Sequence, residues 1–148
     1  MNTKNHCVSL GTNLKINSFS LCYQNVRGLN CKTHLLLKNC SDQSFDMIAL
    51  TETWLNDSVY DSELFTSEFN VVRCDRKFAR VGRTKGGGVL LAISSAVHFS
   101  IVDTMFLTDL VPIIDIVLCR CILSNIRYLI AFVYIPPDVS CQDLETFL

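Results

Sequence analysis

Two apolar stretches of this chain are each followed by a polar residue whose side-chain oxygen could bind a metal ion. Glu52 follows the apolar run Met47–Leu50, whose composition is typical of a strand buried on both faces. Asn25 ends an earlier short apolar stretch, Phe19–Gln24. A carboxylate at the end of a buried strand is costly unless it finds a partner. Amide and carboxylate oxygens are hard ligands of the kind that bind Mg²⁺, which keeps several water molecules and needs only one or two protein carboxylates.

The elements between these residues place both of them at one edge of a sheet. Leucines at 35–37 predict a helix between the two strands, so the chain opens as strand, helix, strand. Such a crossover joins parallel strands, whose carboxyl ends lie at the same edge. We therefore expect Asn25 and Glu52 to converge. Two simpler interpretations stay open, in which Glu52 marks where its strand meets water and Asn25 is a turn residue before Gly28.

A basic segment follows the predicted strand Phe69–Cys74. Residues 73–85 contain six of the 13 Lys and Arg residues of the chain and a single acid, Asp75. This clustering predicts a loop that follows a phosphate backbone, although solvated loops share the same composition. Together with the earlier Arg27, the residues that we expect to bind nucleic acid are Arg76, Lys77, Arg80, Arg83 and Lys85.

The C-terminal half of the sequence predicts further strands. Gly86–Gly88 precede the first of them and lack the spacing of a dinucleotide-binding glycine loop. The turn sequence Ser124-Asn125 predicts that the last two strands form an antiparallel hairpin, and the apolar second strand should be central in its sheet. Ser140 is positioned to cap a final helix. The expected strands are 89–93, 97–102, 113–121 and 126–134.

The length and composition indicate a single domain with a high content of apolar residues. Residues 1–18 are polar, and we expect them to form a poorly ordered leader. Of 148 residues, 49% are hydrophobic and 18% are charged, against about 25% charged in an average soluble domain. The formal net charge of −1 excludes no class of partner. The eight cysteines form no Cys-x-x-Cys pair, which argues against a structural zinc site. The leader has no apolar signal region, so an intracellular, reducing location is expected. No apolar run reaches the ~18 residues of a membrane helix, so no membrane partner is expected.

Three strand-end motifs occur in an order known from one superfamily. They read Asn25-Val26-Arg27-Gly28-Leu29, Thr51-Glu52-Thr53-Trp54-Leu55 and Tyr134-Ile135-Pro136-Pro137, with Gly86-Gly87-Gly88 between the last two. Over residues 19–148 the chain resembles the endonuclease/exonuclease/phosphatase superfamily, the fold of DNase I and the apurinic-site endonucleases. More closely, it resembles the endonuclease domain of non-LTR (LINE-type) retrotransposon proteins of the jockey-like branches.

The resemblance implies an α/β fold that is part of a four-layer α/β sandwich of mixed β-sheets. It implies a DNA-nicking phosphodiesterase that uses Mg²⁺ (or Mn²⁺), with Glu52 as the principal metal carboxylate and Asn25 beside it. Tyr134 would contact the scissile phosphate. In such enzymes the metal offsets charge on the phosphoryl oxygens, and a His–Asp pair handles the attacking water. In a retrotransposon the nick primes reverse transcription, so a full-length relative would carry a reverse transcriptase domain and work in the nucleus.

Two departures from the family pattern lower the expected activity. Arg27 stands where many relatives carry Asp or Asn. The later Asp-x-Asn and Ser-Asp-His segments have no counterpart in this sequence, and neither His34 nor His98 takes the place of the catalytic histidine. We therefore expect a domain truncated after its first half, with an uncovered inner sheet face and reduced or no activity. Two alternatives remain open, a non-enzymatic module that binds nucleic acid through residues 73–85 and a decayed remnant without function.

Overall fold

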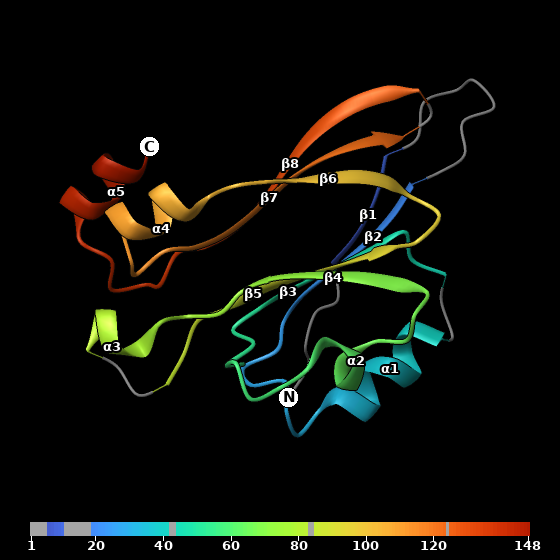
Figure 1. Ribbon diagram of the computed structural model, residues 1–148, viewed down its shortest axis with the longest axis horizontal. Helices are drawn as coiled ribbons and strands as arrows, with labels where there is room; N and C mark the ends of the chain where they lie inside the picture. Colours follow the sequence, from blue (N-terminus) through green and yellow to red (C-terminus); the bar gives the residue numbers. More distant parts are fainter. Residues whose placement is uncertain (1–5, 11–18, 42–43, 83–84, 124) are drawn as a thin grey trace.

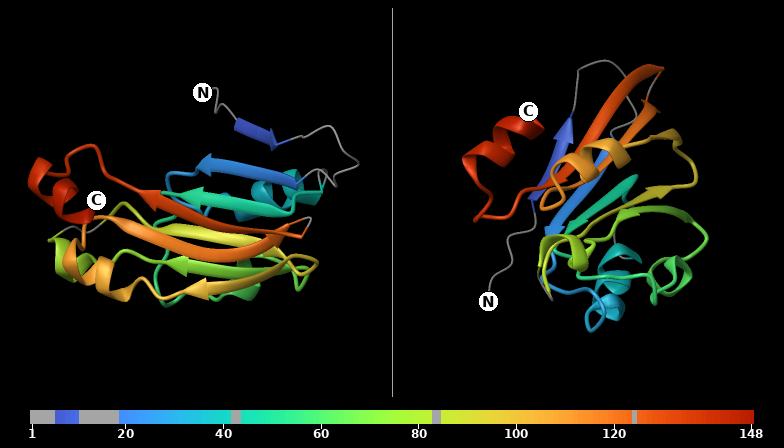
Figure 2. Two further views of the ribbon diagram at one scale, coloured as in Figure 1. Left: turned by 90° about the horizontal axis from the view of Figure 1, so that it is seen from above. Right: turned by 60° about the vertical axis from the view of Figure 1, so that its left-hand side comes forward.

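The computed structural model describes residues 6–10, 19–41, 44–82, 85–123 and 125–148. It confirms the α/β class, because two β-sheets lie face to face with helices on the outer side of the first sheet and at one end of both (Figure 1, Figure 2). The strands are β1 (His6–Leu10), β2 (Phe19–Asn25), β3 (Met47–Thr51), β4 (Phe69–Cys74), β5 (Val89–Ser94), β6 (His98–Val102), β7 (Asp115–Leu123) and β8 (Ile126–Tyr134). The helices are α1 (Thr33–Ser41), α2 (Asp61–Leu64), α3 (Phe78–Val81), α4 (Met105–Leu110) and α5 (Cys141–Phe147).

The first sheet has the strand order β1-β2-β3-β5-β4. β2 and β3 are parallel, with Asn25 opposite Thr51, which confirms the predicted strand, helix, strand opening. The other neighbouring strands of this sheet are antiparallel. β3 is buried at every position because it lies in the middle of the sheet with apolar layers on both faces.

Residues His6–Leu10 form β1, so the prediction of a leader without regular structure is wrong for this segment. β1 pairs antiparallel with β2. An uncovered edge strand presents unpaired backbone groups that can bind another extended segment. The rest of the predicted leader lies outside the described residues.

The second sheet has the order β6-β7-β8 and is antiparallel throughout. The prediction that 126–134 is a central strand is wrong, because β7 is the middle strand and, in the described part of the chain, β8 pairs on one side only. A continuous apolar run indicates that its side chains are buried, but it does not indicate how many strands pair with it. The outward-facing Leu129 on β8 is in fact 65% exposed.

A core of apolar side chains fills the space between the two sheets. Met47, Ala49 and Leu91 of the first sheet pack with Val117 and Cys119 of the second. This corrects the expectation of an uncovered inner sheet face, since β6–β8 cover it. The strands alternate inward and outward residues, so the β7–β8 hairpin has an apolar face of its own that is buried against the first sheet.

A second core lies on the outer face of the first sheet. Leu36 of α1 and Leu64 of α2 pack there with Ile48 and Leu50 of β3. α3, α4 and α5 instead gather at one end of the two sheets, where β3 and β8 end (Figure 1). Within the described residues, no helix has both the length and the apolar character needed to cross a membrane.

Candidate functional site

Strand ends from both sheets meet at the end of the molecule that carries α3, α4 and α5 (Figure 1). β3 ends at Thr51 and continues into Glu52, and β8 ends at Tyr134. β7 begins there as well, since Asp115 lies opposite Tyr134 in the antiparallel pair. A carboxylate from the first sheet and a phenol from the second therefore converge.

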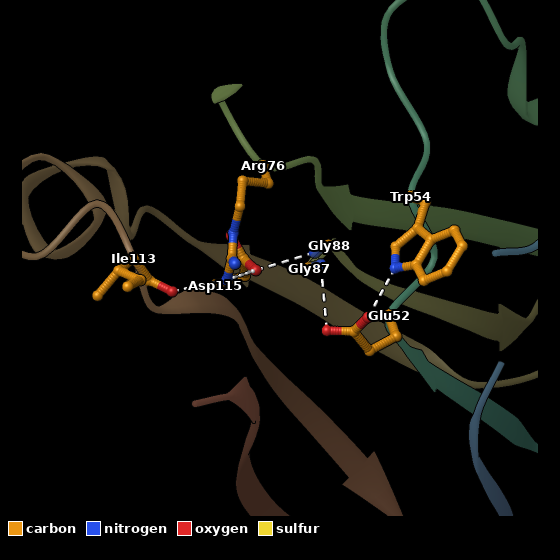
Figure 3. A network of polar contacts seen from close by, with 7 residues as sticks. All are labelled: Glu52, Trp54, Arg76, Gly87, Gly88, Ile113 and Asp115. Carbon is orange, nitrogen blue, oxygen red and sulfur yellow. Dashed lines mark hydrogen bonds and ion pairs between the residues drawn. The ribbon is translucent and has the colours of Figure 1, made fainter. Parts of the chain in front are cut away.

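Two N–H donors hold the Glu52 carboxylate. Its Oε1 accepts from the Gly87 N–H at 3.2 Å and its Oε2 accepts from the Trp54 Nε1–H at 2.6 Å (Figure 3). The Tyr134 side chain lies close enough to this carboxylate to lower its pKa. The backbone of Glu52 is left-handed, with a φ of 59°, and that of Trp54 has a φ of 55°. Bulky residues rarely adopt this conformation, which is concentrated at functional sites and held there by the surrounding structure.

The charge states of this pair follow from these contacts. Burial acts to raise the pKa of Glu52, but the hydrogen bonds from Tyr134, Trp54 and Gly87 and the charge of Arg76 outweigh it and hold the pKa below its ordinary value. Burial, together with the hydrogen bond to Glu52 and its negative charge, raises the pKa of Tyr134 to about 12. At neutral pH Glu52 is therefore ionised and Tyr134 keeps its proton.

Arg76 lies inside the molecule, so the prediction that it contacts nucleic acid is wrong. Its Nη2 donates to Asp115 Oδ2 at 2.6 Å and to the Ile113 carbonyl at 2.6 Å, and its Nε donates to Asp115 Oδ1 at 3.3 Å (Figure 3). The two side chains are 1% and 3% exposed. The Arg76 guanidinium also lies 5.5 Å from the centre of the Tyr134 ring. Two parallel hydrogen bonds to a buried carboxylate explain why this cation leaves the surface, and a run of basic residues gives no sign of such a pairing.

Asp115 was not expected from the sequence, and it connects Arg76 to the candidate site through two glycines. Its Oδ2 accepts from the Gly88 N–H at 2.8 Å. Gly87 donates its N–H to Glu52 and accepts from the Trp54 N–H at 3.1 Å. Burial raises the pKa of Asp115, against the effect of its hydrogen bonds. A single acid inside the apolar run 113–121 was the available signal for this residue, because buried carboxylates need partners.

The two glycines are needed for this close approach. Both have a positive φ, 74° at Gly87 and 88° at Gly88. A Cβ at Gly87 would overlap the guanidinium of Arg76, and a Cβ at Gly88 would overlap the Thr53 hydroxyl oxygen. The glycine run therefore serves side-chain packing around the site, in agreement with its lack of a nucleotide-binding spacing.

Asn25 takes its predicted place at the edge of the sheet. It is the last residue of β2, it is exposed, and it lies opposite Thr51, next to Glu52 in the chain. Residues paired across two strands share a face of the sheet, so Asn25 lies on the face that carries Ala49 and the second sheet.

The remaining basic residues are divided between surface and interior. Arg27, Lys77 and Lys85 are exposed, and the Lys85 Nζ lies 4.2 Å from the centre of the Trp54 ring. Arg73 is instead engaged with Asp61 at 3.3 Å and Asp75 at 3.2 Å. The side chains of Arg80 and Arg83 lie outside the described residues. The segment 73–85 is thus partly a structural element, which weakens its interpretation as a continuous binding loop.

The donor set around Glu52 fits a cation that is shared with substrate. The carboxylate is ionised, and each oxygen uses one lone pair for an N–H donor, leaving further acceptor positions. Among the described residues, no group of three or more His, Cys, Asp or Glu side chains could enclose a metal ion. Mg²⁺ suits such a site because it is commonly held by one or two carboxylates, water and substrate phosphates.

Comparison with protein-family models and with curated proteins gives no match for this chain.

Proposed function

We propose that this chain is a Mg²⁺-dependent phosphodiesterase domain of the DNA-nicking type, similar to the endonuclease/exonuclease/phosphatase superfamily and to the endonucleases of LINE-type retrotransposons. The observation that carries the proposal is the convergence of Glu52 and Tyr134 from two separate sheets. The donors Trp54 and Gly87, together with the nearby Tyr134, favour the ionised carboxylate, which is the form that binds a divalent cation.

Each residue has a chemical role in this proposal. Glu52 would ligate the cation, and Asn25, which ends the neighbouring strand β2, would supply an amide oxygen. The cation, when bound, would offset negative charge on the phosphoryl and leaving oxygens. Tyr134 keeps its proton and can donate a hydrogen bond to a phosphate oxygen. The buried Arg76 guanidinium places a positive charge next to the Tyr134 ring.

We expect slow turnover. Of the described histidine side chains, His34 lies on α1 and His98 on β6, opposite Ile122 at the far end of the second sheet from Tyr134. Within the described residues no hydrogen bond joins either histidine to Glu52 or Tyr134. A missing proton-transfer group lowers a rate by about 10²–10⁴-fold. The proposal also includes DNA as the partner, a nuclear location, and a reverse transcriptase domain in a longer relative.

The direct test is nicking of supercoiled plasmid in Mg²⁺ by the intact chain and by Glu52→Gln. This substitution keeps the shape of the side chain and removes its charge. The expected result is slow, Mg²⁺-dependent nicking that falls at least ~10²-fold in Glu52→Gln, since electrostatic stabilisation is a large part of such catalysis. The matched control is Glu68→Gln, an exposed acid before β4, at the other end of the sheet. Equal nicking by the parent chain and Glu52→Gln would refute the assignment.

A second readout does not depend on turnover. Trp54 is the single tryptophan of the chain, and its indole N–H bonds directly to Glu52. Paramagnetic Mn²⁺ bound at Glu52 should quench Trp54 fluorescence with saturation, and Glu52→Gln should lose the saturable part. Saturable quenching without nicking would indicate an inactive domain that retains its metal site. If neither nicking nor saturable quenching occurs, the metal-dependent function is excluded and the view of a decayed remnant is favoured.

A further inference from the structure

A hollow lies beside Trp54, and the residues assigned to the metal-dependent chemistry do not line it. Its volume is about 340 Å³, in the usual range for small-molecule sites. The loops after β2 and β3, the start of α3 and Lys85 line it, and the residues that matter below are Arg27, Asn30, Thr53, Trp54, Phe78 and Lys85.

Trp54 forms a rigid wall of this hollow. Its backbone N–H bonds to Gly87 at 3.1 Å and its indole N–H bonds to Glu52 at 2.6 Å. The indole also packs on the backbone of Gly28, where a Cβ would come within 2.7 Å of Trp54 Cε3. The ring is half-buried, so these contacts fix it and leave part of it accessible.

A cation covers the ring from the solvent side. The Lys85 Nζ lies 4.2 Å from the ring centre, and Lys85 itself is exposed. A single exposed cation–π contact contributes only about 0.5–1 kcal/mol, so Lys85 can leave the ring when a better partner arrives. A second cation, Arg27, lines the same hollow, and no carboxylate is found among the described residues that line it. The hollow therefore favours an aromatic group that carries negative charge.

Further polar groups in the hollow are available to a ligand. Asn30 offers an amide with both donor and acceptor atoms, and Phe78 adds a second aromatic surface. Thr53 also lines the hollow, but its hydroxyl oxygen is buried against Gly88 and is not open to a ligand.

We propose that this hollow binds an unpaired nucleotide of a DNA strand. The base stacks on Trp54, and Lys85 and Arg27 bind the flanking phosphates. Aromatic platforms combined with cations are the usual means of binding single strands, because every base has a stacking face. A base within a duplex has both faces covered by its neighbours, so only an unpaired base can use the ring. The proposal rests on the proposed function, since Trp54 also touches Glu52 and one strand could reach both sites.

The test is a fluorescence titration of the intact chain with a ten-nucleotide single-stranded oligonucleotide in EDTA, where no metal-dependent cleavage occurs. Because Trp54 is the single tryptophan, stacking should quench the intrinsic fluorescence of the chain. The same oligonucleotide made with abasic sites has the phosphates without the bases, and it should quench little. Equal quenching by the abasic strand or by inorganic phosphate would overturn the proposal, because either result would show binding of the anion alone.

Substitutions separate the two parts of the subsite, with binding followed by anisotropy of a labelled oligonucleotide. Trp54→Leu should weaken binding roughly 5- to 150-fold, the range expected for one stacked base, and Trp54→Phe should restore part of it. Lys85→Ala should lower the slope of log affinity against log salt by about 0.7, as expected for one phosphate contact on a single strand. The control Tyr60→Leu changes another exposed aromatic residue outside the hollow and should have no effect.

The outcomes also distinguish this inference from the proposed function. Plasmid nicking that depends on Glu52, without base-dependent quenching, would leave the phosphodiesterase assignment intact and refute the subsite. Base-dependent quenching without any metal response would support the subsite and refute the phosphodiesterase assignment. Unchanged affinity in both Trp54→Leu and Lys85→Ala would also refute the subsite. Lys85→Ala changes an exposed side chain and should fold normally, so it tests the subsite even if Trp54→Leu does not fold.

Discussion

The contacts of one carboxylate determine what the candidate site can bind. Glu52 is ionised because its hydrogen-bond donors outweigh the effect of burial, and these donors come from Trp54, Gly87 and Tyr134. These contacts favour the charged form, which makes the lowered pKa a property of the local structure. An isolated acid at a strand end would have no such preference.

Protonation of Glu52 should be visible in the fluorescence of Trp54, whose indole N–H bonds to it. Because folding lowers the pKa of Glu52, its ionised form stabilises the fold at neutral pH, and this contribution is lost as the pH falls from the ordinary value of 4.5 through the lower folded value. The fluorescence transition should therefore have a midpoint below pH 4.5, and Tyr134→Phe should move it upward by removing one donor. Glu52→Gln is the control and should show no such transition. A midpoint above 4.5 in the parent chain would contradict the assignment of these donors.

At the scale of the elements, a buried ion pair joins the two sheets at the site. Arg76 follows β4 in the first sheet, and Asp115 begins β7 in the second. Asp115 also holds Gly88, which precedes β5. The pair therefore links β4, β5 and β7, and β5 and β7 are paired with β3 and β8, whose ends carry Glu52 and Tyr134.

Removal of one partner of this pair should destabilise the protein strongly. Arg76→Met leaves the Asp115 carboxylate buried without its cation, which should lower the free energy of unfolding by about 3–5 kcal/mol. In a double-mutant cycle, Arg76→Met together with Asp115→Asn should cost less than the sum of the two single changes. Urea denaturation followed by circular dichroism measures each value. The control Lys77→Met changes the neighbouring exposed cation and should cost no more than about 0.5 kcal/mol. Additive effects in the cycle would argue that the two side chains act independently.

At the scale of the whole molecule, the two sheets share one core. Leu91 of β5 is fully buried between them, among residues of both sheets. The outer face of the second sheet is different, because Ile122 and Leu129 there are 49% and 65% exposed. Exposed apolar strands of this kind promote association between molecules.

A shared core predicts that both sheets unfold together. Leu91→Ala should lower the free energy of unfolding by about 2–5 kcal/mol, through lost burial and the cavity that remains. Trp54 fluorescence and far-ultraviolet circular dichroism should report the same single transition before and after the change. Leu129→Ala, on the exposed face, is the control and should cost roughly 0.5 kcal/mol. Separate transitions for the two signals would mean that the second sheet is stabilised independently of the first.

Local patterns in the amino-acid sequence predict most of the secondary-structure elements and the position of Glu52, the main candidate metal ligand. The buried strand before Glu52, the parallel pairing that places Asn25 at the same edge, the antiparallel hairpin of β7 and β8, and the Ser140 cap of α5 all followed from patterns of neighbouring residues. These features depend on side-chain periodicity and turn chemistry, which act over a few residues. Asp115 had a weaker signal, as a single acid in an apolar run.

Contacts between residues far apart in the chain follow from tertiary packing, and local patterns do not predict them. The basic residues at 73–85 look alike in sequence, yet Arg76 is buried against Asp115 and Lys85 lies over Trp54. Strand pairing is likewise not predicted, because an apolar run indicates burial but does not indicate which sheet the strand joins. The second sheet, its cover over the first, and the hollow beside Trp54 arise from contacts between segments far apart in the chain. The energies of such contacts depend on three-dimensional packing, which no local pattern records.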